Sequence, residues 1–271
     1  MSTAREPESP PSKVALQGIR KEFAYKGRRL PVLDSVGFDV QEGEFVSIIG
    51  PSGCGKSTLL NIIAGLEEPT EGSLWLNGNL AHRPLGQVGY MHQKDLLLPW
   101  RSVLDNAALG LEVQGVPRAQ ARARALALTE RFGLKGFERE YPFALSGGMR
   151  QRAAFLRSVL TGKDILLLDE PFGALDALTR AQMQEWLLEL WSAFKKTILL
   201  VTHDVEEALF LSDRVHVFTA RPGRISLTME VGLPRPRNHD LVTREPFISY
   251  KAQLLTAIRQ ESLSAQEEPW R

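Results

Sequence analysis

Residues 50–58 read Gly50-Pro51-Ser52-Gly53-Cys54-Gly55-Lys56-Ser57-Thr58 and match the pattern G-x-x-x-x-G-K-[ST]. They follow an apolar run, Phe45–Ile49, and lead into a helical pattern, Lys56–Ala64. Glycines let successive backbone N–H groups face one anion, and the helix N-terminus adds partial positive charge. The Lys56 side chain can then reach the β- and γ-phosphates of a nucleotide, and the Ser57 hydroxyl can ligate Mg²⁺. A chance glycine-rich turn is the alternative, but the flanking strand and helix favour a phosphate site.

Cys54 is the only cysteine of the sequence, and it lies inside this loop. Without a second cysteine no intramolecular disulfide can form, which is typical of a reducing compartment. An anion-binding loop would favour the thiolate form, and hence a redox role for Cys54. The pattern accepts almost any residue at this position, so we favour the alternative that Cys54 only fills space.

Two acidic residues, Asp169 and Glu170, directly follow the apolar run Ile165–Leu168. They lie at the C-terminal end of a predicted buried strand, which is the edge where α/β sheets bind ligands. Asp169 is placed to hold Mg²⁺ through water, and Glu170 to polarise an attacking water. A solvated acidic turn is the alternative, and the glycine-rich loop argues against it.

The segment Leu145–Arg152 reads LSGGMRQR and precedes a helical pattern. Ser146 can cap this helix, while Gly147 and Gly148 leave its N-terminus open to an anion. On these residues alone, an ordinary helix start is the better interpretation.

The order of apolar patterns predicts one α/β core that is interrupted by helices. Apolar or mostly apolar runs predict strands at Phe45–Ile49, Ile165–Leu168 and Thr197–Thr202, and a helical pattern between the last two indicates a βαβ unit in a buried parallel sheet. Residues 102–152 show helical patterns without a strong strand signal, which places a helical insertion at roughly 96–159. A weak amphipathic helix is expected from Phe247 to Ile258.

Composition excludes several classes of protein. The chain has 271 residues, of which 43% are apolar and 24% charged, and its formal net charge is +1. These values are typical of a globular domain and argue against a protein that binds nucleic acid through bulk charge. No apolar run approaches the roughly 18 residues of a transmembrane helix. Residues 1–12 are polar and proline-containing, lack the apolar segment of a signal peptide, and are expected to form a disordered tail.

The motifs together resemble those of an ATP-binding cassette (ABC) ATPase, from Val14 to about Pro234. In chain order the corresponding segments are Walker A at 50–58, the Q-loop at Gln93, the signature at 145–152, Walker B at 165–170, the D-loop at 173–176 and the H-loop at 202–204. The resemblance implies a P-loop NTPase (RecA-like) α/β core with an antiparallel β subdomain and an inserted α-helical subdomain. It also implies an ATPase domain over residues 13–235, a helical subdomain at about 96–159, and a C-terminal helical extension over 236–271.

The resemblance also implies how two copies would share ATP. Two protomers would sandwich two ATP molecules head to tail. The signature residues Ser146, Gly147 and Gly148 would bind the ATP held by Lys56 of the partner subunit, and Asp176 would link the two sites.

Within one copy, the resemblance implies an ATP and Mg²⁺ site. Glu170 would act on water, His203 would contact the γ-phosphate, and Gln93 would sense it while ligating Mg²⁺ with Ser57 and Asp169. Without the other motifs, His203 would read as a satisfied core histidine.

An aromatic residue upstream of the glycine-rich loop stacks on adenine in this family. Phe23 and Tyr25 both qualify, because Lys26–Leu30 resembles a small insertion. We favour Phe23 for its Arg-Lys-Glu-Phe setting. Either ring packing in the core is the alternative.

A narrower resemblance, to the nitrate, sulfonate and taurine importer group, rests on Leu97–Trp100, Val103–Asn106 and Ala220–Ile225. It implies an ATP-hydrolysing homodimer docked on two membrane-spanning permease subunits at the cytoplasmic face of the inner membrane. An extracytoplasmic solute-binding protein would deliver the solute, and no nucleic acid is involved. His92 departs from the group, in which an aromatic residue such as Phe usually precedes the glutamine.

Trp100 follows Pro99 at the start of the helical segment. We predict that Trp100 helps line the groove that receives a cytoplasmic helix of the permease, since large amphipathic rings are enriched at interface hot spots. A core position for this large aromatic is the alternative.

Two other functions stay open on the sequence. One is a soluble ABC ATPase without a transport role, in cofactor assembly or on the ribosome. The other is an inactive nucleotide-binding scaffold, which the presence of Glu170 and His203 argues against.

Overall fold

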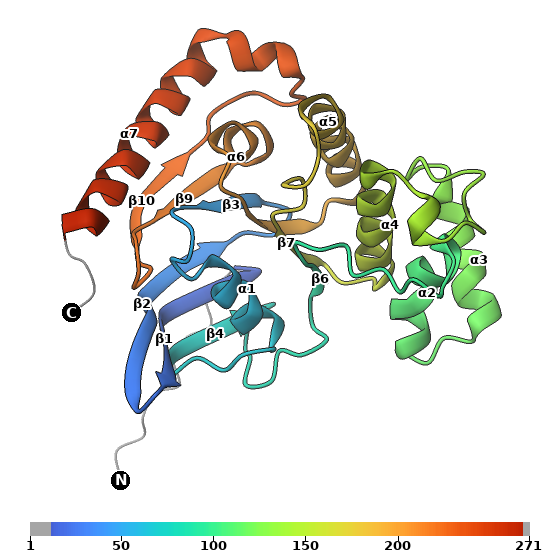
Figure 1. The fold of residues 1–271 in the computed structure, drawn as a ribbon, viewed down its shortest axis with the longest axis horizontal. Coiled ribbons are helices and arrows are strands. Elements are labelled where there is room, and N and C mark those ends of the chain that lie inside the picture. The colour runs from blue at the N-terminus through green and yellow to red at the C-terminus, as the bar shows by residue number, and fades with distance from the viewer. Residues whose placement is uncertain (1–11, 268–271) are drawn as a thin grey trace.

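The computed structural model describes residues 12–267 and contains two β-sheets (Figure 1). The four-stranded antiparallel sheet has the order β2-β1-β4-β5, and the six-stranded sheet has the order β10-β9-β3-β8-β7-β6. In the larger sheet β9, β3, β8, β7 and β6 run parallel, and β10 pairs antiparallel with β9 at one edge. The strands are β1 (Val14–Tyr25), β2 (Arg28–Val40), β3 (Phe45–Ile49), β4 (Glu71–Leu76), β5 (Asn79–Leu80), β6 (Gly89–Met91), β7 (Ile165–Asp169), β8 (Thr197–Val201), β9 (Arg214–Phe218) and β10 (Ile225–Glu230).

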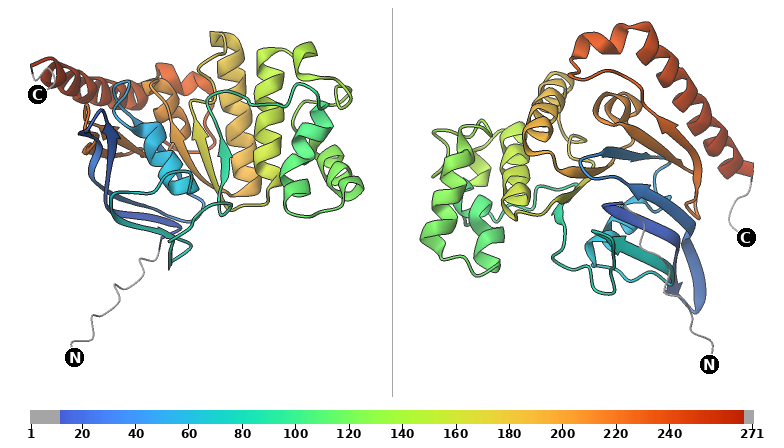
Figure 2. Two further views of the ribbon diagram at one scale, coloured as in Figure 1. Left: turned by 60° about the horizontal axis from the view of Figure 1, so that its bottom comes forward. Right: turned by 180° about the vertical axis from the view of Figure 1, so that it is seen from behind.

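The helices fall into three groups around these sheets (Figures 1 and 2). Helix α1 follows the glycine-rich loop and faces the antiparallel sheet, α2 to α4 gather at one end of the molecule, and α5 to α7 cover the side away from the antiparallel sheet. The α-helices are α1 (Lys56–Ala64), α2 (Val103–Val113), α3 (Arg118–Thr129), α4 (Gly147–Leu160), α5 (Ala177–Phe194), α6 (Val205–Leu211) and α7 (Glu245–Glu267). Two short 3₁₀ turns lie at Pro142–Ala144 and His239–Thr243.

The central strands are buried on both faces, which explains their continuous apolar sequences. Every residue of β3, β7 and β8 is buried. Because side chains alternate along a strand, Ile165 and Leu167 pack with α1 and the antiparallel sheet, while Leu166 and Leu168 pack with the other helices. The predicted α/β class, with an antiparallel sheet and an inserted helical segment, is confirmed.

Several elements differ from the sequence-based expectations. The strand expected at Thr197–Thr202 ends at Val201, and the C-terminal helix runs from Glu245 to Glu267 rather than from Phe247 to Ile258. The sequence analysis did not identify α6, β6 or β10. Residues 1–11 of the predicted tail lie outside the described residues, and Ser12 is buried. Within residues 12–267, none of the helices combines the length and the hydropathy of a membrane-spanning segment.

Candidate functional site

The glycine-rich loop joins β3 to α1, as predicted, and wraps around the ammonium group of Lys56. This side chain is buried, and its Nζ donates to the carbonyl oxygens of Gly50 at 2.8 Å and Pro51 at 2.9 Å. Gly55 precedes α1 with φ +106°, and a Cβ on it would lie 2.7 Å from Leu33 Cδ2. The first turn of α1 has no side-chain cap and no acidic residue. Its N–H groups are therefore free of a competing carboxylate, which suits an anion.

Ser57 and Asp169 meet where α1 begins and β7 ends. Ser57 Oγ donates to Asp169 Oδ1 at 3.2 Å, and burial raises the pKa of the Asp169 carboxyl. A hydroxyl and a carboxylate are the hard oxygen ligands that Mg²⁺ prefers, so the donor set fits this ion. No group of three or more His, Cys, Asp or Glu side chains forms a metal site within residues 12–267. The remaining ligands of Mg²⁺ would then be the predicted ligand Gln93 together with waters and phosphate oxygens, which this ion usually keeps.

Tyr90, in β6, touches the same carboxylate, and the sequence analysis did not single it out. Its Oη lies 3.1 Å from Asn61 Oδ1 and 3.5 Å from Asp169 Oδ2. Burial raises the pKa of Tyr90 above its usual range, so the phenol stays protonated and donates. The His92 ring packs on Tyr90 with the centroids 3.9 Å apart, and burial lowers the His92 pKa. His92 is therefore a half-buried neighbour of the carboxylate site.

Glu170 gathers two side chains from distant segments. Gln93 Nε2 donates to Glu170 Oε2 at 2.9 Å, and His203 Nδ1 lies 3.4 Å from the same oxygen. Glu170 has φ +46°, a conformation that is uncommon outside glycine and is often found at functional sites. The structure thus brings together three of the predicted site residues beside Asp169.

The signature residues lie apart from this cluster in the same chain. Ser146 is exposed and caps α4, with its Oγ accepting the Met149 N–H at 3.2 Å. A Cβ on Gly148 would lie 3.0 Å from Thr179 Cγ2, so the start of α4 packs against the start of α5. Within residues 12–267, no hydrogen bond or ion pair joins Ser146, Gly147 or Gly148 to Lys56 or Glu170.

Asp176 caps α5 on the exposed surface beside the signature segment. Its Oδ1 accepts the Thr179 N–H at 3.0 Å, and this bond lowers the pKa of the Asp176 carboxyl. The side chain is therefore held as a carboxylate at the helix start.

The two candidate adenine-stacking rings differ in exposure. Phe23 is half-buried against the core of the antiparallel sheet, with Lys21 Nζ 4.8 Å from its ring centroid. Tyr25 is 61% exposed near the tip of the β1–β2 hairpin, with Lys26 Nζ 5.3 Å from its ring. Both stay candidates, and the predicted insertion at Lys26–Leu30 forms the turn and the start of β2.

The exposure of Cys54 and Trp100 decides between the two interpretations given for each residue. Cys54 is 1% exposed, and burial raises its pKa although Lys56 Nζ lies 3.7 Å from Sγ. A raised pKa disfavours the thiolate that a redox role needs, which supports the space-filling interpretation. Trp100 is 71% exposed, so the alternative that places it in the core is wrong.

The turn at Arg221–Arg224 packs against the backbone of the glycine-rich loop, a contact that the sequence analysis did not predict. Gly223 N–H donates to Val32 O at 2.8 Å, and a Cβ on Gly223 would lie 2.2 Å from Cys54 O. Only glycine fits this close backbone approach. A short Arg-Pro-Gly-Arg sequence does not by itself indicate the segment that it contacts.

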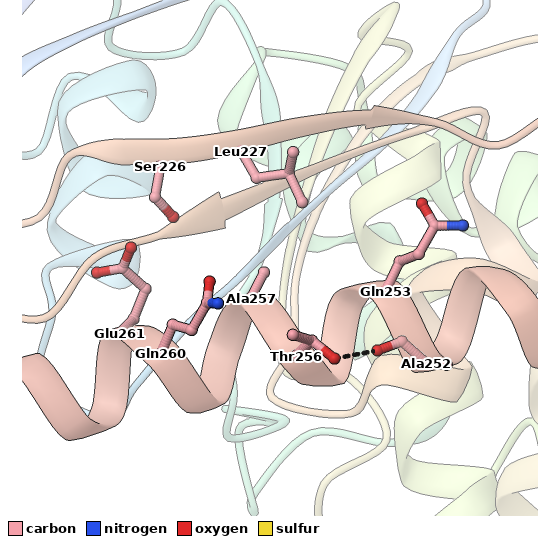
Figure 3. A pocket seen from close by; sticks show the side chains of 8 residues that line it. All are labelled: Ser226, Leu227, Ala252, Gln253, Thr256, Ala257, Gln260 and Glu261. Atoms are coloured by element: carbon pink, nitrogen blue, oxygen red, sulfur yellow. Dashed lines mark hydrogen bonds between the residues drawn. The ribbon is translucent and has the colours of Figure 1, made fainter.

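A groove of about 510 Å³ lies between β10 and α7 (Figure 3). Leu227, Ala252 and Thr256 are among its lining residues. None of the residues predicted to bind nucleotide lines it. The groove is therefore separate from the candidate site.

Comparisons with known proteins agree with the geometry. Residues 33–173 match the family model described as ABC transporter. The chain is 46% identical over 237 residues, 88% of this chain and 92% of the relative, to the formylaminopyrimidine import ATP-binding protein ThiZ of Halalkalibacterium halodurans. It is 49% identical over 209 residues, 77% of this chain and 80% of the relative, to the taurine import ATP-binding protein TauB of Rhizobium johnstonii. The dimeric ATP-binding cassette MJ0796, solved in a post-hydrolysis state with ADP and Pi, has a TM-score of 0.72 and 30% identity, covering 82% of this chain and all of that one.

Proposed function

The chain belongs to the ABC transporter family of ATP-binding proteins, and from this premise we propose that it powers the import of a small solute of the nitrate, sulfonate or taurine kind. It binds and hydrolyses ATP, as the family does. The observation that carries the proposal is the 46–49% identity to proteins named for the import of taurine and formylaminopyrimidine. Leu97–Trp100 and Ala220–Ile225 support the same group. These relatives favour an importer over the soluble, non-transport alternative.

We propose that the chain works as a homodimer on two membrane-spanning permease subunits, at the cytoplasmic face of the inner membrane. A solute-binding protein outside the membrane would deliver the solute. The nucleotide-binding unit would span residues 13–235, with the helical subdomain at about 96–159 inserted and residues 236–271 as an extension.

Each residue of the candidate ATP site has a proposed task. Lys56 and the loop N–H groups bind the β- and γ-phosphates, while Ser57, Asp169 and Gln93 hold Mg²⁺, which neutralises phosphate charge when it is bound. Glu170 orients and polarises the attacking water, and His203 contacts the γ-phosphate. Phe23, with Tyr25 as the second candidate, stacks on adenine.

The experiment that tests the importer role is purification of the tagged chain from detergent-solubilised membranes. We expect a hydrophobic, multi-span partner to copurify, and phosphate release by the complex to rise when solute-loaded binding protein is added. A chain that is recovered only without a membrane partner would contradict the proposal.

A mixed-dimer experiment tests the cross-protomer role of Ser146. Ser146 is exposed and has no contact with Lys56 in its own chain, so Ser146→Arg should leave ATP binding by the monomer intact. Mixing Ser146→Arg chains with Lys56→Ala chains should form hybrid dimers with one intact composite site and one site damaged twice. We expect these hybrids to bind nucleotide asymmetrically in equilibrium binding measurements. Loss of ATP binding by the isolated Ser146→Arg monomer would show that Ser146 acts within its own chain.

Trp100→Ala tests the proposed docking groove. Because the ring is 71% exposed, its loss should leave the melting temperature and ATP binding nearly unchanged. Docking on the permease should weaken by about 2 kcal/mol or more, the usual cost of truncating a hot spot. Copurification of the permease and solute transport measure this effect. Val113→Ala is the control, since Val113 is also apolar and is 81% exposed. Normal copurification of the permease with Trp100→Ala would refute the assignment of Trp100 to the permease-binding groove.

A further inference from the structure

Helices α5 and α6 each begin at a loop that the proposed function uses. The loop 173–176, which includes Asp176, leads into α5, and the loop 202–204, which includes His203, leads into α6. The two helices pack against each other (Figure 1). A side chain that joins both helix starts would therefore join both loops.

Arg180, in the first turn of α5, makes this connection. Its Nη2 donates to the carbonyl oxygen of Leu175 at 3.1 Å, within the first loop. Its Nη1 donates to Asp204 Oδ2 at 3.2 Å, at the end of the second loop. The Arg180 guanidinium thus connects the two loops, with one terminal nitrogen bonded to each loop.

Asp204 in turn fixes the start of α6 and the backbone next to His203. Its Oδ1 accepts the N–H groups of Glu206 at 2.9 Å and Glu207 at 3.2 Å, and its own N–H donates to Thr202 Oγ1 at 3.0 Å. His203 lies between Thr202 and Asp204, and its ring reaches Glu170 at 3.4 Å. Movement of Asp204 would therefore carry His203 with it.

A second polar contact lies one helical turn further along. Gln184 is four residues after Arg180 and so shares its face of α5. Gln184 Nε2 donates to Glu207 Oε2 at 3.2 Å, and both side chains are buried. Burial raises the pKa of Glu207 to about 7, and Oε2 accepts this bond whether or not the carboxyl is ionised. The two contacts thus join the N-terminal half of α5 to the start of α6 at two points.

We propose that Arg180 is a positioning residue, which transmits the position of loop 173–176 to His203. The inference rests on the proposed function, because it takes loop 173–176 as the part that meets the partner subunit. When the partner presses on this loop, Arg180 and Asp204 set the distance between His203 and the γ-phosphate. Hydrolysis would then be fastest only in the assembled dimer.

A double-mutant cycle on the purified chain tests this proposal. Arg180→Met removes both bonds at similar side-chain length, and Arg180→Lys keeps the charge for one of the two partners. We expect Arg180→Met to lower kcat for phosphate release by roughly 10- to 100-fold, as a small misplacement of a catalytic group does, with little change in KM for ATP. Arg180→Lys should restore part of this loss. Adding Arg180→Met to His203→Ala should lower kcat no further, since Arg180 acts through His203.

The controls separate positioning from general destabilisation. Arg259→Met is the matched control, because it makes the same substitution at an exposed position of α7. It should keep the wild-type kcat and melting temperature. Additive effects of Arg180→Met and His203→Ala, an unchanged kcat, or a kcat loss that follows a large fall in melting temperature would overturn the proposal. All measurements use the chain without membrane partners, so failure to find a permease would refute the importer role and leave this result standing.

Discussion

Glu170→Gln should slow ATP hydrolysis by roughly 10²–10⁴-fold, the range for removal of a general base, and leave ATP and Mg²⁺ binding in place. Glutamine keeps the size of the side chain but loses the negative charge that polarises water. The predicted ligands Ser57 and Asp169 are untouched, and Lys56 is held by its own loop. Unhydrolysed ATP would then bridge two protomers, so the variant should elute from gel filtration as an ATP-dependent dimer. Phosphate release and elution volume are the two measurements.

Glu189→Gln is the matched control for this prediction. Glu189 is exposed on α5, far along the helix from Asp176, and its replacement should change neither turnover nor elution. Near-normal turnover of Glu170→Gln would remove Glu170 from the role of base.

Arg237→Met should destabilise the folded chain by about 3 kcal/mol, because it removes hydrogen bonds from a charged donor and leaves several buried carbonyl oxygens unpaired. Arg237 is 7% exposed, and its two terminal nitrogens donate to five carbonyl oxygens: those of Leu209, Phe210, Ser212, Val231 and Leu233. Burial lowers the pKa of Arg237 to about 10, so the guanidinium is still charged at neutral pH. Methionine would leave these buried acceptors, including carbonyls at the end of α6, without a donor. Urea unfolding followed by circular dichroism measures the loss.

Two further variants make this result specific. Arg237→Lys keeps the charge but cannot reach both sets of carbonyls, so an intermediate loss is expected. Arg259→Met, on the exposed face of α7, should stay within about 0.5 kcal/mol of the wild type. A loss below about 1 kcal/mol for Arg237→Met would show that the five hydrogen bonds do not stabilise the fold.

The central sheet could be predicted from the sequence because its strands are buried on both faces. The run in β3 is apolar except for Ser47, those in β7 and β8 are continuous, and each run ends at a glycine or polar residue. Helix α6 has only seven residues, too few to display a helical period, and β6 has only three. In β10, Ile225, Leu227 and Met229 alternate with polar residues, so a strand signal was present there and was overlooked.

The site residues that could be predicted from the sequence are those that lie next to each other in one short motif. Lys56 and Ser57 belong to one loop, and Asp169 and Glu170 end one strand, so local patterns identified them. Gln93 and His203 carry no local pattern, and only the family resemblance pointed to them. Their contacts with Glu170 form across segments that are 77 and 33 residues apart in sequence, which no local pattern encodes. The contacts of Tyr90, Arg180 and Gly223 were missed for the same reason.

The burial of Cys54 makes this chain a convenient starting point for spectroscopic labelling. The only native thiol is 1% exposed and has a raised pKa, so a maleimide or nitroxide reagent would react with it slowly. A cysteine introduced at Leu178, which is 72% exposed beside Asp176, would then be the single reactive position. Spin labels at position 178 of both protomers could report the distance between the two 173–176 loops during ATP turnover. The native cysteine in the phosphate loop would not have to be removed first.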